Sequence, residues 1–255
     1  MKVLGIIPAR YESSRIAHKP LFKLLGIECV LHVYYRAVLS KDLTDLIVAT
    51  DSEIIGTFLG NNNIPYLITS RTHNNPTERM IEVIKKFPNY ERYVLVNGDE
   101  VLLNPQHIKK SIELLHDGKY MVSLLLTNFS KRNSNSDFKV VRNFRNEVIY
   151  ISRADIPSSK DYQNSKFLKA YHLMTFLPEA LHAYSCFPPS ELEIIEQHEH
   201  IRFIENGYKI ITDIVDSNSI SLDNLDDVSY IENQLLSDPL FLNYSEQHHN
   251  AQSGK

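Results

Sequence analysis

The stretch Tyr93–Pro105, YVLVNGDEVLLNP, places a pair of acids directly after an apolar segment. Its first four residues, YVLV, are apolar and predict a buried strand. Asn97-Gly98 ends that strand, and Asp99 and Glu100 follow at once. In open α/β sheets, ligands bind at the carboxyl ends of strands, where acids can hold Mg²⁺ together with phosphate oxygens. On its own, Gly98-Asp99 favours an ordinary turn, so the rest of the chain has to decide between the two interpretations.

Strands and helices alternate on both sides of this stretch. Apolar runs rich in branched residues predict strands, and apolar residues at helical spacing predict helices. The expected strands are residues 2–7, 45–50, 66–69, 93–96 and 120–126, and the expected helices are residues 30–39, 53–59, 76–87 and 105–116. This order predicts the α/β class, with a mainly parallel sheet flanked by helices in a core domain of residues 1–127.

The pattern changes at Asn128. Residues 138–151 predict a hairpin and residues 167–176 another strand, with polar, turn-rich segments around them. We expect residues 128–190 to form a smaller, β-rich region inserted into the core domain or lying over it.

The last part of the chain predicts a return to the core. Ser190 and Glu193 form a capping box, which predicts a helix as far as Asn206 with Leu192 and Ile195 facing inward. A strand and a further helix follow, so we assign residues 191–240 to the core. Residues 241–255 are polar and predict a disordered tail, with His248-His249 in solvent.

Composition excludes several classes of function. The formal net charge of −4 over 255 residues argues against general nucleic-acid binding, although a local cluster of cations can still bind an anionic small molecule. Cys29 and Cys186 are too few for a disulfide framework, which favours a reducing, cytoplasmic location. The opening MKVLGIIPAR does not resemble a secretory signal, and every apolar run is too short to span a membrane.

The loop after the first strand, residues 8–21, carries the cations Arg10, Arg15 and Lys19. Guanidinium groups suit phosphate oxygens, so this loop predicts a phosphate-binding cradle, although it lacks the glycines and the GK[ST] ending of a Walker motif. A solvated surface loop is about as good an explanation from these residues alone.

A second polar segment precedes the helix that begins at Pro76. Asn75 is a typical N-cap, and proline is favoured at the first helical position. Arg79 lies in the first turn, where the helix dipole disfavours a cation. A ligand at the sheet edge would explain that placement, and a salt bridge to Glu82 is the alternative.

These residues together resemble the CMP-Kdo synthetases, the 3-deoxy-manno-octulosonate (Kdo) cytidylyltransferases, from residue 2 to about residue 235. The matching blocks are IIPARYESSRIAHKPL (6–21), IVATD (47–51), PTERM (76–80), VNGDE (96–100), FKVV (138–141), YISRADIP (150–157), residues 191–210 and SLDNLDDV (221–228). The resemblance implies a Rossmann-like nucleotidyltransferase that transfers CMP from CTP to a 3-deoxy-ulosonic acid and releases pyrophosphate, for surface polysaccharide synthesis. It also implies a homodimer formed through the smaller, inserted region, which takes part in sugar binding.

The resemblance further implies roles for individual residues. Arg10, Lys19 and Asp99 would be catalytic, and Mg²⁺ would be the cofactor, held by Asp99 and Asp223. The residues that would contact CTP are Ala9, Arg10, Ser14, Arg15, Lys19, Thr77 and Arg79. The residues that would contact the sugar acid are Asn97, Ser152, Arg153, His172, Glu196 and His200.

The chain departs from the family pattern mainly on the sugar side. The family's QGDEP is NGDEV here, its Gly before TER is Pro76, its PGKP is AHKP, and His200 stands for Gln. The family's HxGxYGY strand carries Ala170, His172, Met174, Thr175 and Phe176 at its defined positions. Because the metal and nucleotide residues are nearly complete, we expect the same reaction on a different sugar acid, such as an amino-substituted or differently configured one, with Kdo a poor substrate. The two new histidines add groups that ordinarily titrate near neutral pH.

Two other functions remain open from the sequence. The chain could be a nucleotidyltransferase for another sugar or nucleotide, or a non-catalytic paralogue that binds nucleotide or sugar. The presence of both Asp99 and Asp223 argues against the paralogue. Glu196 and His200 also have the i, i+4 spacing of helical metal ligands, for which an exposed ion pair is the commoner explanation.

Overall fold

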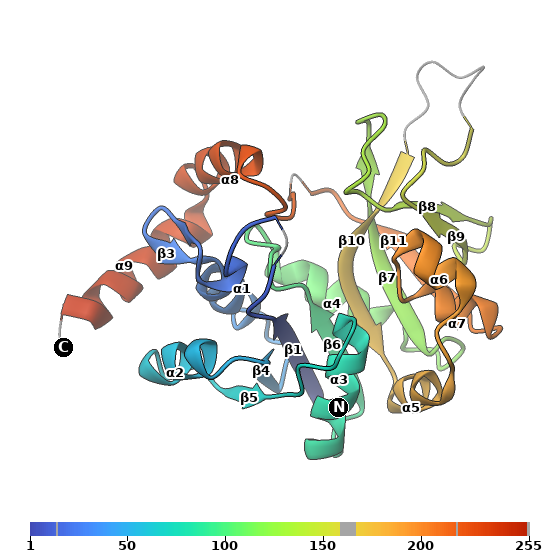
Figure 1. Ribbon diagram of the computed structural model, residues 1–255, viewed down its shortest axis with the longest axis horizontal. Helices are drawn as coiled ribbons and strands as arrows, with labels where there is room; N and C mark the ends of the chain where they lie inside the picture. Colours follow the sequence, from blue (N-terminus) through green and yellow to red (C-terminus); the bar gives the residue numbers. More distant parts are fainter. Residues whose placement is uncertain (14, 159–166, 218, 254–255) are drawn as a thin grey trace.

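The computed structural model describes residues 1–13, 15–158, 167–217 and 219–253, and one sheet organises them. The strand order is β11-β7-β10-β6-β1-β4-β5, with the hairpin β8–β9 attached to one end of β10 (Figure 1). The strands are β1 (Val3–Ala9), β4 (Asp45–Thr50), β5 (Tyr66–Ile68), β6 (Arg92–Val96), β7 (Val122–Phe129), β8 (Lys139–Arg142), β9 (Val148–Ser152), β10 (Phe167–Phe176) and β11 (Ile210–Ile214). The predicted mainly parallel sheet flanked by helices is confirmed.

Strand β10 is the main difference from the expected topology. It is antiparallel to both β6 and β7, whereas β1 pairs in parallel with β4 and β6. The sequence places β10 in the inserted region, but the structure places it in the middle of the main sheet. Most of its residues are buried on both faces, so the strand requires neighbours on both sides.

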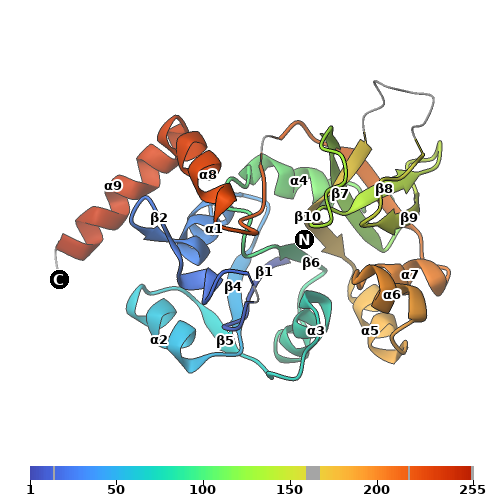
Figure 2. The same cartoon turned by 45° about the horizontal axis from the view of Figure 1, so that its top comes forward.

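Helices cover the two faces of the sheet and form two hydrophobic cores. One core joins the sheet to α1 (Cys29–Ala37), α2 (Glu53–Asn61) and α4 (Pro105–Glu113), with α9 (Pro239–Ser253) beside α1 and α8 (Asp226–Leu236) beside α9. The other joins it to α3 (Pro76–Lys86), α5 (Pro178–Cys186) and α7 (Ile201–Glu205), which follows α6 (Glu191–Glu196). Figure 2 shows α8 and α9 on one side of the molecule and α5, α6 and α7 on the other. The short elements η1 (Lys19–Leu21), β2 (Lys23–Leu24) and β3 (Ile27–Glu28) complete the N-terminal part.

The prediction of one continuous helix from Ser190 to Asn206 is wrong, because α6 ends at Glu196 and a separate helix, α7, begins at Ile201. The capping box at Ser190 forms as predicted, but Gln197 has the left-handed conformation with φ of 54°. Arg202 binds both carboxylate oxygens of Glu193, at 2.6 and 2.5 Å, and this buried pair holds α6 and α7 together across the break. Leu192 and Ile195, expected to face the core, are 38% and 65% exposed.

The prediction of disorder from residue 241 onward is also wrong, because α9 continues to Ser253. Phe241 and Tyr244 are buried against α1, and the Tyr244 hydroxyl lies 2.6 Å from Nδ1 of His32. His248 is buried and bonded to Tyr35 rather than solvated, and the side chain of His249 lies outside the described residues. Among the described residues, none of the helices is both long and apolar enough to cross a membrane.

Candidate active site

A cavity of about 340 Å³ opens at the carboxyl ends of β1 and β6. The expected site residues that line it are Arg10, Arg15, Lys19, Arg79, Asn97, Asp99, Arg153, His172, His200 and Asp223. The expected residues Ala9, Thr77, Ser152 and Glu196 are described but are not part of its wall. Ser14 lies outside the described residues. Residues far apart in sequence are therefore brought to one place by the sheet.

Glu100 anchors the segment that carries Asp223. The hydroxyls of Ser219 and Ser221 donate to its carboxylate at 2.7 and 2.5 Å. The backbone N–H of Leu222 also donates to the backbone oxygen of Asp99, at 3.1 Å. Glu100, 3% exposed, thus fixes the loop before α8 so that Asp223 lies near Asp99.

Lys19 lies between the two acids. Its Nζ is 2.7 Å from Oδ2 of Asp99 and 3.7 Å from Oδ1 of Asp223, and Arg15 binds Asp223 at 2.9 Å. Burial opposes ionisation of Asp99, but Lys19 outweighs burial and lowers the pKa of this carboxyl. Burial and the neighbouring Asp99 raise the pKa of Asp223. Two close carboxylates offer the oxygen ligands that a divalent cation prefers, and Lys19 and Arg15 balance their charge in this structure.

Gly98 allows the acids to approach the cationic loop. A Cβ atom at this position would lie 2.5 Å from the backbone oxygen of Pro8, which is too close for any side chain. The end of β6 and the end of β1 therefore meet only because residue 98 is a glycine. This contact places Asp99 next to the loop of residues 8–21.

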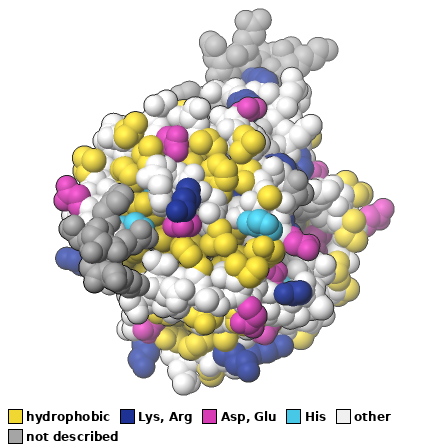
Figure 3. All heavy atoms as spheres, turned by 60° about the vertical axis from the view of Figure 1, so that its left-hand side comes forward, with side chains coloured by type: hydrophobic (Ala, Val, Ile, Leu, Met, Phe, Trp, Pro, Cys, Tyr) yellow, Lys and Arg dark blue, Asp and Glu magenta, His cyan; other side chains and the backbone are white. Residues whose placement is uncertain are grey.

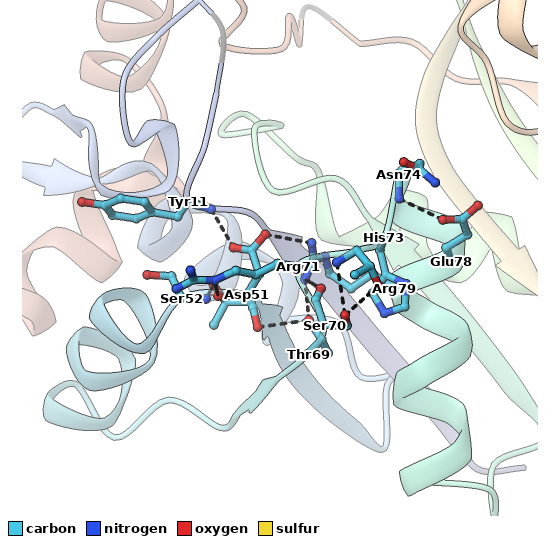
Figure 4. Close-up of polar contacts among 12 residues, drawn as sticks. Tyr11, Asp51, Ser52, Thr69, Ser70, Arg71, His73, Asn74, Glu78 and Arg79 are labelled. Atoms are coloured by element: carbon cyan, nitrogen blue, oxygen red, sulfur yellow. Dashed lines mark hydrogen bonds and ion pairs between the residues drawn. The ribbon is translucent and has the colours of Figure 1, made fainter.

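Arg79 joins the ends of β4 and β5 to α3, as Figure 4 shows. Its guanidinium lies 3.1 Å from Oδ2 of Asp51 and also bonds to the Thr69 hydroxyl. The alternative partner Glu82 instead accepts from the Ser70 N–H at 2.8 Å and from His73 at 2.6 Å. Arg79 is 4% exposed, so the wall of the cavity on this side is held rigidly.

Glu196 holds the β8–β9 hairpin in place. Its carboxylate accepts from the Tyr150 and Ser152 hydroxyls at 3.1 and 2.8 Å, and from the Arg153 N–H at 3.0 Å. The Arg153 guanidinium then lies over the Phe138 ring, 4.2 Å from its centre, and forms part of the cavity wall. Glu196 and Ser152 therefore position Arg153.

Three histidines, His172, His198 and His200, lie together in the cavity wall. His172 has φ of 57° at a register shift in β10, a conformation that favours glycine. The His198 ring lies 6.3 Å from the His172 ring and 4.9 Å from the His200 ring, measured between centres. Burial lowers the pKa of His172 to about 4 and that of His200 to about 3, so the expectation that these groups titrate near neutral pH is wrong.

Several lining residues were not expected from the sequence. They are His73, Asn74, Asn75, Phe138, Gln197, His198 and Glu199, among others. A signal existed in the polar run Glu196–His200, EQHEH, which interrupts an otherwise apolar helical stripe. Such an interruption indicates either a break in the helix or a buried polar site, and here it is both.

Sequence and structure comparisons with known proteins agree with one another and together cover nearly the whole chain. A cytidylyltransferase family model matches residues 4–210. The 3-deoxy-manno-octulosonate cytidylyltransferase of Protochlamydia amoebophila is 32% identical over 251 residues, covering 94% of this chain and 97% of its own. An 8-amino-3,8-dideoxy-manno-octulosonate cytidylyltransferase from a Shewanella strain is 31% identical, covering 92% and 99%. The solved structure of a CMP:2-keto-3-deoxy-manno-octonic acid synthetase complexed with CTP superposes with a TM-score of 0.86 at 27% identity, covering 92% and 99%.

Proposed function

This chain belongs to the cytidylyltransferase family, and from that premise we propose that it transfers CMP from CTP to the anomeric hydroxyl of a 3-deoxy-ulosonic acid. The observation that carries the proposal is the cavity in which Asp99 and Asp223 lie beside Lys19 and Arg15. Phosphoryl transfer depends on positioning and charge neutralisation, and these groups supply both.

The donor set at Asp99 and Asp223 fits Mg²⁺. Both carboxylates line the cavity, and Lys19 already provides a positive charge between them. Mg²⁺ is bound in proteins by a few carboxylates together with substrate phosphates, and it would neutralise charge on the reacting phosphate. We therefore assign Asp99 and Asp223 as the residues that would hold it.

The cations of residues 8–21 act on the triphosphate. Arg10, Arg15 and Lys19 face the cavity next to the two acids, where they can bind phosphate oxygens. The sugar hydroxyl loses its proton to solvent and attacks the α-phosphorus, the bond from this phosphorus to the bridging oxygen breaks, and pyrophosphate leaves with that oxygen. The cations stabilise the charge that develops on the departing pyrophosphate.

The sugar end of the cavity supports a modified sugar acid as the substrate. Of the positions that depart from the family pattern, Asn97, His172 and His200 line the cavity, whereas Ala170 and Met174 are packed in the core. A relative at 31% identity is named for an 8-amino sugar acid. We propose an amino-substituted 3-deoxy-ulosonic acid as the preferred substrate, with Kdo used less well.

Pyrophosphate release from CTP tests both levels of the proposal. The protein is assayed with Mg²⁺ and a panel containing Kdo, its 8-amino analogue and hexose 1-phosphates, with ATP, GTP and UTP as competing nucleotides. We expect release only with CTP and an ulosonic acid, and a kcat/KM for Kdo lower by about tenfold or more, since one lost hydrogen bond costs roughly 1–3 kcal/mol. No release with any ulosonic acid contradicts the reaction, and Kdo as the best substrate contradicts only the preference.

We also propose that the protein is a homodimer, formed through α6 and β9. On α6, Ile194 and Ile195 are 66% and 65% exposed, and on the adjoining β9, Ile149 is 53% exposed. Large apolar side chains gathered at the surface often mark protein interfaces. The cytoplasmic location expected from the sequence remains a prediction.

A further inference from the structure

His198, Glu199 and His200 form a second group of possible metal ligands in the cavity wall. One ring nitrogen of each histidine and one carboxylate oxygen of Glu199 all lie within 4.8 Å of one another. These residues follow the break at Gln197, where the chain leaves the helical conformation. The break places three consecutive residues at one point, which a continuous helix would not do, since successive residues point in different directions.

The two histidines of this group each have an unsatisfied ring nitrogen. Nδ1 of His198 and Nδ1 of His200 are buried and have no hydrogen-bond partner among the described residues. The side chains are 2% and 4% exposed, so solvent does not readily compensate. Buried polar atoms in native proteins are nearly always bonded, and an exception calls for a ligand or another explanation.

Thr77 fixes the orientation of one of these rings. Its hydroxyl lies 3.3 Å from Nε2 of His200, and Oε1 of Glu199 lies 3.7 Å from the same nitrogen. Metal-bound histidines usually have their second ring nitrogen held by such a partner, which sets the tautomer. If Nε2 carries the proton and donates to Thr77, the lone pair of Nδ1 is available to a metal.

We propose that His198, Glu199 and His200 bind a divalent transition-metal ion such as Zn²⁺, at a site separate from Asp99 and Asp223. Two imidazoles and a carboxylate are a common ligand set for Zn²⁺, whereas Mg²⁺ prefers oxygen ligands. Zn–N and Zn–O distances of about 2.0–2.2 Å place tetrahedral ligand atoms about 3.4 Å apart, so separations of up to 4.8 Å have to shorten by up to about 1.4 Å. Three protein ligands leave one coordination position open toward the cavity, where a substrate oxygen or amine can bind.

Binding of Zn²⁺ alone tests this site without any substrate. The full chain is treated with a chelator and dialysed, and its Zn²⁺ affinity is measured by competition with a chromophoric chelator. Visible absorption after Co²⁺ substitution reports the coordination geometry. The variants are His198→Leu, His200→Gln and the nearly isosteric Glu199→Gln. The controls are Asp99→Asn/Asp223→Asn and His107→Gln, because His107 also has a buried, unpartnered Nδ1 but belongs to a different cavity.

We expect one bound Zn²⁺ per chain, with affinity reduced at least tenfold in each of the three site variants and unchanged in both controls. Bound Zn²⁺ should also raise the Tm of the unmodified chain but not that of Glu199→Gln, which is the readout if a histidine variant folds poorly. Equal affinity in Glu199→Gln and the unmodified chain overturns the proposal. Loss of Zn²⁺ binding in the Asp99→Asn/Asp223→Asn variant also overturns it, because the ion then occupies the acid pair.

Discussion

Two residues, Lys19 and Glu100, hold the carboxylates of Asp99 and Asp223 close together. Lys19 contacts both carboxylates from the cationic loop, and Glu100 holds the Asp223 segment through Ser219 and Ser221. In the sequence, Asp99 and Glu100 are adjacent acids, and only the family resemblance singles out Asp99 as the Mg²⁺ ligand. The structure separates them, because Glu100 is buried and bonded to two serines whereas Asp99 faces the cavity.

Replacing Asp99 should abolish turnover without unfolding the protein. Asp99→Asn removes one of the two charges that would hold Mg²⁺, so we expect pyrophosphate release to fall at least about a hundredfold. The matched control is Asp213→Asn, because the Asp213 carboxylate is partly exposed, pairs with Lys110 and is not part of the cavity wall. Near-normal release by Asp99→Asn at ordinary Mg²⁺ concentrations contradicts the assignment.

Glu100 should make stability depend on pH. Burial and the neighbouring Asp99 raise the pKa of Glu100 from 4.5 to about 7 in the folded protein, against the opposing effect of Lys169. A raised carboxyl pKa means that the folded state binds the proton more tightly. Its contribution to stability is therefore complete below about pH 4.5 and is lost as the pH rises through 7.

The variant Glu100→Gln cannot ionise, so it should lose this dependence. We expect its free energy of unfolding to vary less between pH 5 and pH 8 than that of the unmodified protein, by up to about 3 kcal/mol. Urea unfolding at a series of pH values measures the difference, with the exposed Glu113→Gln as the control. Parallel pH profiles for Glu100→Gln and the unmodified protein argue against the raised pKa.

At the scale of elements, the sequence predicts those segments whose local pattern is sufficient. The start of α3 at Asn75-Pro76 follows from its capping residues, and Asn75 does accept a hydrogen bond from the Glu78 N–H. The break at Gln197 could not be found in this way, because it depends on Glu193 meeting Arg202 in three dimensions. The position of β10 in the sheet likewise depends on its pairing with β6 and β7, and the hydrophobic periodicity of the sequence does not reveal pairing partners.

The helix α9 could not be predicted from local pattern either, because its few buried side chains are widely spaced among polar residues. Phe241, Tyr244, Ser245 and His248 are buried, and most of the other described residues of α9 are polar, so composition predicts disorder. At the site, the cations of residues 8–21 and Asp99 could be predicted because they follow strand ends, whereas Asp223 was expected only from the family resemblance. The His198–His200 group had only the polar run Glu196–His200 as a signal, because its assembly requires the helix break.

The contact of α9 with α1 should contribute measurably to stability. Nε2 of His32 faces the Leu24 carbonyl at 2.9 Å and must donate to it, so Nδ1 accepts from the Tyr244 hydroxyl. Burial lowers the pKa of His32 to about 4, which keeps the ring neutral. Tyr244→Phe leaves Nδ1 unpaired, and we expect a loss of about 1–3 kcal/mol in urea unfolding.

The control for this measurement lies on the same helix. Leu242 is 53% exposed, so Leu242→Ala should change stability by less than about 0.5 kcal/mol. Equal stabilities for Tyr244→Phe and Leu242→Ala would mean that α9 contributes nothing through this hydrogen bond.

The molecule has two exposed apolar surfaces that are candidates for the interface between the two copies of a dimer. One is the surface of α6 and β9, and the other lies over α8 and α9, where Leu236 and Leu242 are 59% and 53% exposed. Figure 3 shows apolar side chains gathered on the side of the molecule that carries α8 and α9. The proposed dimer uses the first surface, next to the hairpin β8–β9.

Charged substitutions on each surface separate the two possibilities. We expect Ile194→Glu/Ile195→Glu to give a monomer in sedimentation equilibrium, because burying unpaired carboxylates at an interface is costly. The matched variant Leu236→Glu/Leu242→Glu should remain a dimer. If only Leu236→Glu/Leu242→Glu gives a monomer, the interface lies on α8 and α9 instead. If the unmodified protein is itself a monomer, the proposed dimer is wrong.

The central place of β10 also sets the order in which the molecule can be completed during synthesis. Residues 92–96 and 122–129 leave the ribosome well before residues 167–176, the strand that lies between them. Until then β6 has an unpaired edge and β7 has no neighbour in the sheet, a state in which nascent chains are prone to aggregate. A chain of residues 1–127 should therefore fail to form a stable monomer, as circular dichroism and sedimentation would show, whereas a chain of residues 1–217 can close the sheet.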